Sequence, residues 1–130
     1  MASRELSDLK APFRLRAEAW LARCKAAGLD VLVYCTLRPN AEQDALYAQG
    51  RSKPGDIVTW AKGGQSAHNY GLALDFVPLV NGKPQWTPGS ALYLQAIALA
   101  ESEGMEAAAR WPRTKREYPH LQEPDWRQYV

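Results

Sequence analysis

The chain has 130 residues, of which 46% are hydrophobic, and this is enough for one domain with a buried core. Its 16 basic and 14 acidic side chains give a formal net charge of +2, which is too weak to predict nucleic-acid binding but does not oppose approach to an anionic polymer. No segment approaches the roughly 20 apolar residues of a membrane span, and the polar first ten residues do not resemble a Sec signal peptide, so we expect synthesis in the cytoplasm and no membrane insertion.

The N-terminal part of the sequence predicts a helix followed by a strand. Apolar residues recur at three- and four-residue intervals over residues 6–24, which is typical of an amphipathic helix. Gly28 stands where a left-handed C-terminal cap is expected. The apolar run over residues 31–36 then predicts a buried strand.

A second helix and a long loop are expected next. Asn40 can cap a helix over residues 40–50, with Gln43 three positions later in the place of a capping box. Residues 51–65 have no regular pattern. Because loops of this length inside compact domains tend to be functional or disordered, and this one leads directly into a histidine segment, we interpret it as functional.

Alternating side chains over residues 71–77 predict another strand. In this pattern Asp75 points to the face opposite the large apolar side chains. Asn81-Gly82 follows after a few residues and is a strong signal for a tight reversal, so a hairpin is expected here.

The C-terminal part predicts a third helix over residues 90–103, and residues 105–130 should hold one strand and short helical turns. We therefore expect an α+β fold in which helices back a small, mostly antiparallel sheet, as a single domain over residues 1–130. Cys24 and Cys35 lack a CxxC spacing, and reduced core thiols are favoured over a disulfide or a zinc knuckle.

The two histidines of the chain suggest a metal site. His68 and His120 each lie near a carboxylate, Asp75 and Glu117, so three groups could bind Zn²⁺ and the fourth could act as a general base. Each of these residues has a simpler alternative. A single histidine is more often a hydrogen-bonded side chain than a metal ligand, and Glu117 lies in a charged run typical of a solvated face. Asp75 could cap a helix or pair with Arg38, but a carboxylate in such an apolar strand is costly without a cation or hydrogen-bond donors, and metal binding would supply the cation.

Three segments carry a more specific pattern: Ser66-x-His68-x-x-Gly71-x-Ala73-x-Asp75, the upstream Thr36-Leu37-Arg38-Pro39 with Glu42-Gln43-x-x-Leu46-Tyr47-x-x-Gly50-Arg51, and Pro119-His120. Together they resemble the VanY-like zinc peptidases, which include D-alanyl-D-alanine carboxypeptidases and the L-alanyl-D-glutamate endopeptidases that bacteriophages use as endolysins. The resemblance covers residues 29–122 and is closest to the endolysin branch.

The resemblance implies a role for each matched residue. His68, Asp75 and His120 would bind one Zn²⁺ per chain, Glu117 would be the catalytic carboxylate, and Arg38 would face the scissile carbonyl. Such a site supports metal-assisted amide hydrolysis, in which Glu117 moves a proton from water to the leaving amine and Arg38 stabilises the oxyanion.

Ser66 and Gln43 are further candidates, for hydrogen bonds to the substrate or to the residues that surround the metal ligands, although either could simply cap a turn or a helix. The sequence departs from the endolysin pattern at Ala107–Ala109, where three alanines replace a tryptophan and two glycines at an expected wall of the cleft.

The function implied is a zinc peptidase that acts as a monomer on the L-alanyl-D-glutamate bond of bacterial peptidoglycan, reaching the wall from the host cytoplasm through a holin pore. A D-alanyl-D-alanine carboxypeptidase and a non-catalytic, zinc-containing wall-binding module are the alternatives. The altered alanine segment is the feature that favours the second of these.

Overall fold

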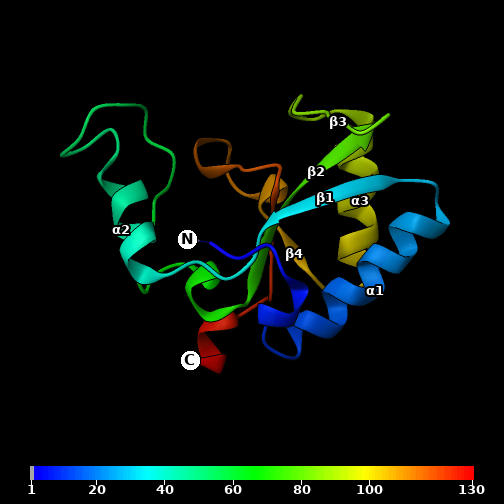
Figure 1. Cartoon of the computed structure of the whole chain (residues 1–130), viewed down its shortest axis with the longest axis horizontal. Helices are drawn as coiled ribbons and strands as arrows, with labels where there is room; N and C mark the ends of the chain where they lie inside the picture. The colour runs from blue at the N-terminus through cyan, green and yellow to red at the C-terminus, as the bar shows by residue number, and fades with distance from the viewer. Residues whose placement is uncertain (1) are drawn as a thin grey trace.

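An antiparallel sheet forms the framework of residues 2–130, the part of the chain that the computed structural model describes (Figure 1). Its strand order is β1-β2-β5-β4, with β3 added to the end of β2 as a hairpin. The elements are α1 (Phe13–Ala26), β1 (Asp30–Cys35), α2 (Asn40–Ala48), β2 (Ala73–Val80), β3 (Lys83–Pro84), α3 (Ala91–Ser102), β4 (Glu106–Ala107) and β5 (His120–Gln122), with single 3-10 turns at Leu6–Asp8, Ala67–Tyr70, Ala108–Arg110, Arg113–Lys115 and Trp126–Tyr129. The predicted α+β class is confirmed.

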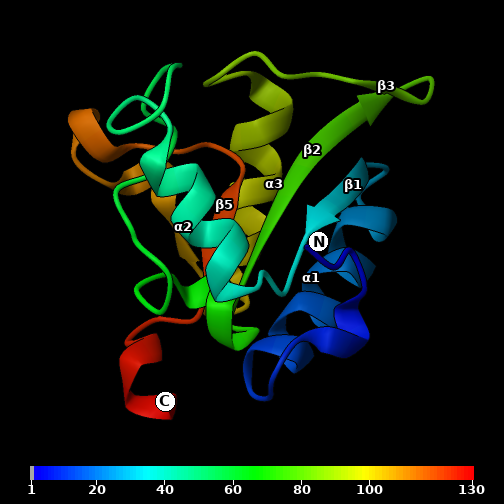
Figure 2. The ribbon, with the colours of Figure 1, turned by 60° about the vertical axis from the view of Figure 1, so that its left-hand side comes forward.

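Helices α1 and α3 lie together against one side of the sheet, whereas α2 stands on the other side with the loop that follows it (Figures 1 and 2). The core lies between the sheet and the helix pair. Trp20 of α1 and Tyr93 of α3 both pack edge-on against Phe76 of β2, with ring centroids 5.0 and 5.4 Å apart. No helix within the described residues has the length and apolar character needed to cross a bilayer.

The alternation predicted along β2 is confirmed. Leu74 and Phe76 are fully buried, with Phe76 packed against the helices, and Asp75 between them projects to the opposite side of the sheet, toward the histidines. The strand continues past the predicted end at residue 77. Pro78 is tolerated because β5 pairs only with residues 73–75, so the missing N–H of Pro78 removes no ladder hydrogen bond on that side.

Three predicted boundaries or signals have clear outcomes. The first helix was predicted from residue 6, but α1 begins at Phe13 because Pro12 interrupts the segment and stands at the N-cap. Gly28 has φ +75°, as expected for the left-handed residue after this helix. The Asn81-Gly82 hairpin is confirmed, with both residues at positive φ, which a type I′ turn requires.

The C-terminal segment contains two short strands where one was predicted. β4 has only two residues, Glu106 and Ala107, and its pairing with β5 comes from the tertiary fold, because two residues are too few for a sequence pattern. This pairing places Glu106 of β4 directly opposite Gln122 of β5 at the outer edge of the sheet.

Trp20 provides a test of the core. Its indole N–H donates to the carbonyl of Ala96 at 2.9 Å, and the side chain is fully buried. We expect Trp20→Phe to lower the free energy of unfolding by about 1–3 kcal/mol, because it leaves a buried carbonyl without its donor and opens a small cavity. Denaturant unfolding measures this. Trp86→Phe, at a side chain that is 54% exposed, should change stability by less than about 0.5 kcal/mol, and an equal loss in both variants would contradict this description of the core.

Candidate metallopeptidase site

The candidate site forms where three neighbouring strands bring polar residues into one row. Asp75 on β2 lies directly opposite Cys35 on β1 and directly opposite His120 on β5. Side chains at directly opposed positions share a face of the sheet. The row therefore places a thiol, a carboxylate and an imidazole side by side on the face away from α1 and α3.

His68 reaches the same place from the 3-10 turn Ala67–Tyr70. Ser66 caps this turn, because its Oγ accepts a hydrogen bond from the His68 backbone N–H at 3.3 Å. Gly71 ends the turn at φ +71°, where a Cβ would lie 2.8 Å from the carbonyl oxygen of Asp8. Only glycine allows this close approach, so the glycine of the sequence motif fixes the path from His68 into β2.

The two imidazoles converge on one oxygen atom of Asp75. Asp75 Oδ1 is 3.1 Å from His68 Nε2 and 3.3 Å from His120 Nδ1. On the far side of the His68 ring, Nδ1 is 2.8 Å from the backbone carbonyl of Thr36, which can only accept a hydrogen bond. His68 therefore presents Nε2 to the cleft, and His120 presents Nδ1.

Electrostatics couple these three side chains. Burial alone would raise the pKa of Asp75, but the adjacent His68 and His120 outweigh it and hold the pKa well below its usual range. Burial opposes protonation of His68, yet the charge and hydrogen bond of Asp75 raise its pKa. The carboxylate is therefore ionised across the physiological range, and a cation between it and the imidazoles is favoured.

Arg38 and Gln43 lie next to this group. Arg38 Nη2 is 3.6 Å from Asp75 Oδ2, so the simple ion pair considered from the sequence is present on the second oxygen of the carboxylate. Arg38 Nη1 donates to Gln43 Oε1 at 2.8 Å. Gln43 is fully buried, and its Nε2 donates to Thr59 Oγ1 and to the carbonyl of Ala61 at 3.2 and 2.8 Å.

Gln43 thus makes the supporting hydrogen bond to a site residue that the sequence allowed, but neither of the other two interactions expected of it. It does not line the cleft, so it has no free atom for a substrate, and it takes no part in a capping box, because α2 has no side-chain cap at all. Its amide instead ties the long loop and Arg38 to α2. Ser66 does line the cleft, but its hydroxyl also caps the turn of His68, which was its alternative interpretation.

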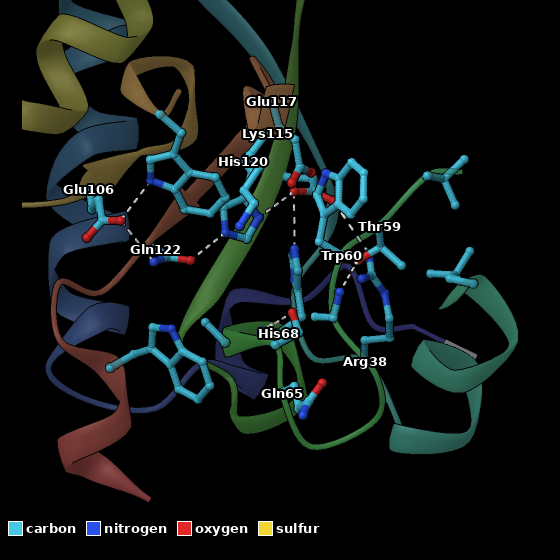
Figure 3. A pocket seen from close by; sticks show the side chains of 18 of the residues that line it. Arg38, Thr59, Trp60, Gln65, His68, Glu106, Lys115, Glu117, His120 and Gln122 are labelled. Carbon is cyan, nitrogen blue, oxygen red and sulfur yellow. Dashed lines mark hydrogen bonds and ion pairs between the residues drawn. The ribbon is translucent and has the colours of Figure 1, made fainter. Parts of the chain in front are cut away.

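Glu117 lies between the turn Arg113–Lys115 and β5, with its half-buried side chain in the cleft beside His120 (Figure 3). Burial raises its pKa, and the negative charge of Asp75 adds to this, while His120, His68 and Arg38 act in the opposite direction. A carboxyl group whose pKa is raised toward neutrality is suited to exchanging protons with a reactant. This environment does not fit a fully solvated charged face.

Cys35 is a metal-binding candidate that the sequence did not suggest. Cys35, His68 and Asp75 each place one ligand atom within 4.8 Å of the others. However, Cys35 Sγ lies beside His68 Nδ1, at 3.8 Å, and accepts from Arg38 Nη2 at 3.3 Å. The thiol thus faces a guanidinium and the imidazole edge that is already bonded to Thr36, whereas Asp75 faces the free nitrogen.

A cleft of about 550 Å³ opens over these residues. The long loop supplies one wall, including Trp60, which is 54% exposed, and Trp111 and Trp126 lie elsewhere along the lining. Lys115 and Arg127 also line it. The volume is in the range of small-ligand sites, and aromatic walls with scattered cations suit a polar ligand that carries carboxylates.

The alanine segment does not form the cleft wall that the sequence suggested. Ala107, Ala108 and Ala109 are all buried in the core, and none lines the cleft. Trp111 provides the aromatic surface in this region instead. The departure from the endolysin pattern therefore changes core packing rather than the surface that faces a substrate.

Several cleft residues were not proposed from the sequence, and two of them lie next to the proposed metal ligands. Glu106 and Gln122 lie directly opposite each other on β4 and β5 and join the polar face of the sheet. The period of two along a strand could have indicated Gln122, since it places residue 122 on the same face as His120. No local signal indicated Glu106.

Comparison with known proteins agrees with this geometry. Residues 59–123 match the family model described as D-alanyl-D-alanine carboxypeptidase. The chain is 40% identical over 124 residues to the peptidoglycan L-alanyl-D-glutamate endopeptidase CwlK of Bacillus subtilis (strain 168), covering 89% of this chain and 74% of that protein.

Two solved structures share the fold. The L-Ala D-Glu endopeptidase ChiX of Serratia marcescens superposes with a TM-score of 0.71 at 20% identity, covering 99% of this chain and 92% of that one. The LD-carboxypeptidase LdcB superposes with a TM-score of 0.69 at 19% identity, covering 88% of this chain and 58% of that one. At these identities the superpositions establish the architecture alone.

The buried Gln43 gives a prediction for the loop. Gln43→Ala removes the hydrogen bonds to Arg38, Thr59 and Ala61, so we expect a loss of about 1–3 kcal/mol in unfolding free energy and faster amide exchange over residues 59–61. Hydrogen exchange measured by mass spectrometry tests this. Gln95→Ala, on the exposed side of α3, is the matched control, and loop exchange that stays at the wild-type rate in Gln43→Ala would refute the anchoring role.

Proposed function

This chain belongs to the VanY-like metallopeptidase family, and from that membership we propose that it is a zinc-dependent peptidoglycan peptidase that hydrolyses the L-alanyl-D-glutamate bond of the stem peptide. The observation that carries the proposal is the convergence of His68 Nε2 and His120 Nδ1 on Asp75 Oδ1, at 3.1 and 3.3 Å, beneath a cleft that also holds Glu117. The identity to CwlK supports the choice of bond.

His68, Asp75 and His120 fit one zinc ion per chain. Ligand atoms of one tetrahedral Zn²⁺ lie roughly 3.3 Å from one another, and the distances from Asp75 Oδ1 to His68 Nε2 and to His120 Nδ1 match this spacing. The two histidines lie on either side of this oxygen, and the described group whose ligand atoms all lie within 4.8 Å of one another is Cys35, His68 and Asp75, so binding of one ion would draw His120 toward His68. Both histidines are buried, and each has its other ring nitrogen hydrogen-bonded. Three protein ligands leave a coordination position for a reactant, as in catalytic zinc sites.

The proposed mechanism distributes the reaction among three groups. A zinc ion held there supplies Lewis acidity, which polarises the scissile carbonyl and acidifies the attacking water. Glu117 accepts the proton of that water and donates it to the leaving amine, a role that its raised pKa favours. Arg38, held by Gln43, places a fixed positive charge near the developing oxyanion.

The cleft suits a stem peptide near the glycan strand. Lys115 and Arg127 provide cations for the carboxylates of D-glutamate and the residue that follows it, and Ser66 offers a hydroxyl at the rim. Trp60 offers an exposed aromatic face.

A D-alanyl-D-alanine carboxypeptidase is the second candidate, favoured by the description of the family model. It would need a cation committed to the free terminal carboxylate. Two arginines considered for this task are engaged elsewhere: Arg51 stacks on Tyr47 with its guanidinium carbon 3.8 Å from the ring centroid, and Arg110 pairs with Glu101. The cleft cations Lys115 and Arg127 suit the carboxylates of either substrate, so the preference for the internal bond rests on the identity to the L-alanyl-D-glutamate endopeptidase.

The non-catalytic wall-binding module loses its main support, because the alanine segment lies in the core. The wider setting follows the sequence resemblance and stays a prediction: a monomeric bacteriophage endolysin made in the host cytoplasm and released through a holin pore, with peptidoglycan as its partner and no nucleic acid.

The ligand assignment predicts the metal content of variants. Purified wild-type protein should hold one zinc per chain, and His68→Ala combined with His120→Ala should abolish binding, because one carboxylate cannot retain the ion. Cys35→Ser should keep the full content. Elemental analysis after dialysis decides this. Full zinc loading of the double variant, or loss of zinc in Cys35→Ser, would refute the assignment.

If Glu117 is the general base, its replacement should lower turnover without lowering zinc binding. Glu117→Gln should keep zinc and fold while turnover falls by roughly 10²- to 10⁴-fold, the usual effect of losing a general acid/base. Glu18→Gln, at an exposed glutamate of α1, should leave turnover unchanged. Near wild-type turnover in Glu117→Gln would show that another group moves the proton.

The products identify the bond. Incubation of purified muropeptides with the enzyme, followed by mass spectrometry, should reveal peptides with a new N-terminal D-glutamate. Release of free D-alanine without such peptides would instead establish the carboxypeptidase.

A further inference from the structure

The outer edge of the site contains a chain of hydrogen bonds that the proposed reaction does not use. His120 Nε2, on the far side of the ring from Asp75, is 2.7 Å from Gln122 Oε1 (Figure 3). An amide oxygen can only accept a hydrogen bond, so Nε2 carries a proton. Nδ1, on the Asp75 side of the ring, is therefore the nitrogen that His120 can offer to a metal ion.

The orientation of the Gln122 amide is itself determined by a neighbour. Gln122 Nε2 donates to Glu106 Oε2 at 3.1 Å, and the same oxygen accepts from the indole N–H of Trp111 at 2.9 Å. A carboxylate cannot donate, so the amide must turn its NH₂ group toward Glu106 and its oxygen toward His120. Without Glu106 the amide could rotate and present the wrong group to the imidazole.

The sheet makes this arrangement rigid. Glu106 and Gln122 are directly opposed on β4 and β5, and Asp75 and His120 are directly opposed on β2 and β5. Gln122 and His120 are 8% and 6% exposed, so water does not readily replace either partner. His68 differs, because the backbone carbonyl of Thr36 performs the same task there and no side-chain substitution can remove it.

We propose that Gln122 and Glu106 are positioning residues that fix His120 in the tautomer that offers Nδ1 to the metal. The inference rests on the proposed zinc site and adds two residues to it. Trp111 and Gln122 donate hydrogen bonds to Glu106, Glu106 fixes the orientation of the Gln122 amide, and the Gln122 amide oxygen fixes the orientation of His120. Hydrogen-bonding partners of this kind typically change metal affinity 10- to 100-fold when removed.

The test measures zinc affinity by chelator competition, with thermal melting as a control for folding. Gln122→Leu removes the acceptor at similar size and should raise the zinc Kd about 10- to 100-fold. Glu106→Leu breaks the chain one step further away and should raise the Kd in the same direction. Gln95→Leu, at the surface of α3, should leave it unchanged.

A double variant separates this role from general packing. Glu106→Gln combined with Gln122→Glu exchanges the amide and the carboxylate, so residue 122 still accepts from His120 and residue 106 still accepts from Trp111. Its zinc Kd should return to within about threefold of wild type.

Wild-type affinity in folded Gln122→Leu, or a double variant as weak as Gln122→Leu, would overturn the proposal. Failure of the wild-type protein to bind zinc would instead overturn the metal site on which it rests.

Discussion

The carboxylate of Asp75 is the constraint around which the site is organised. It lies between the fully buried Leu74 and Phe76 on the central strand, and its side chain is only 15% exposed. A buried charge without partners would cost several kcal/mol, which is a large fraction of the stability of a domain of this size. Three side chains contact the Asp75 carboxylate: His68 from the turn Ala67–Tyr70, His120 from β5 and Arg38 from the segment between β1 and α2. The same partners that make the carboxylate tolerable also create the cation-binding geometry.

The two carboxylates of the site have opposite environments. Asp75, surrounded by cationic and hydrogen-bonding partners, has a lowered pKa and stays ionised as a ligand. Glu117 is partly buried with Asp75 nearby, and its pKa is raised. Carboxylates whose pKa values are driven apart in this way commonly divide electrostatic and proton-transfer roles. The proposed division of labour follows from their surroundings, since both are simple acids of similar intrinsic strength.

Local patterns in the sequence predicted much of the framework. The periodicity of the helices, the alternation around Asp75 and the Asn81-Gly82 reversal each depend on neighbouring residues, and the structure confirms them. The motif also indicated which residues would meet, and His68, Asp75 and His120 do converge. Apart from the start of the first helix, which Pro12 displaces, what failed depended on tertiary pairing. The two-residue strand β4 has no pattern of its own, and the contacts of Gln43 reach across to the loop rather than along its helix.

The outer polar residues were missed for the same reason. Glu106 and Gln122 are 16 positions apart, and they become neighbours only because β4 and β5 pair in one register. Cys35 likewise enters the site through the pairing of β1 with β2. A one-residue slip in either pairing would turn these side chains to the opposite face of the sheet. The chemistry of the cleft is therefore specified by strand register as much as by the motif.

Zinc K-edge X-ray absorption of the purified protein tests most directly the claim that Asp75 gathers the two imidazoles around one ion. The account predicts only nitrogen and oxygen scatterers, at about 2.0–2.2 Å. A sulfur scatterer at about 2.3 Å would contradict it, because it would place Cys35 among the ligands.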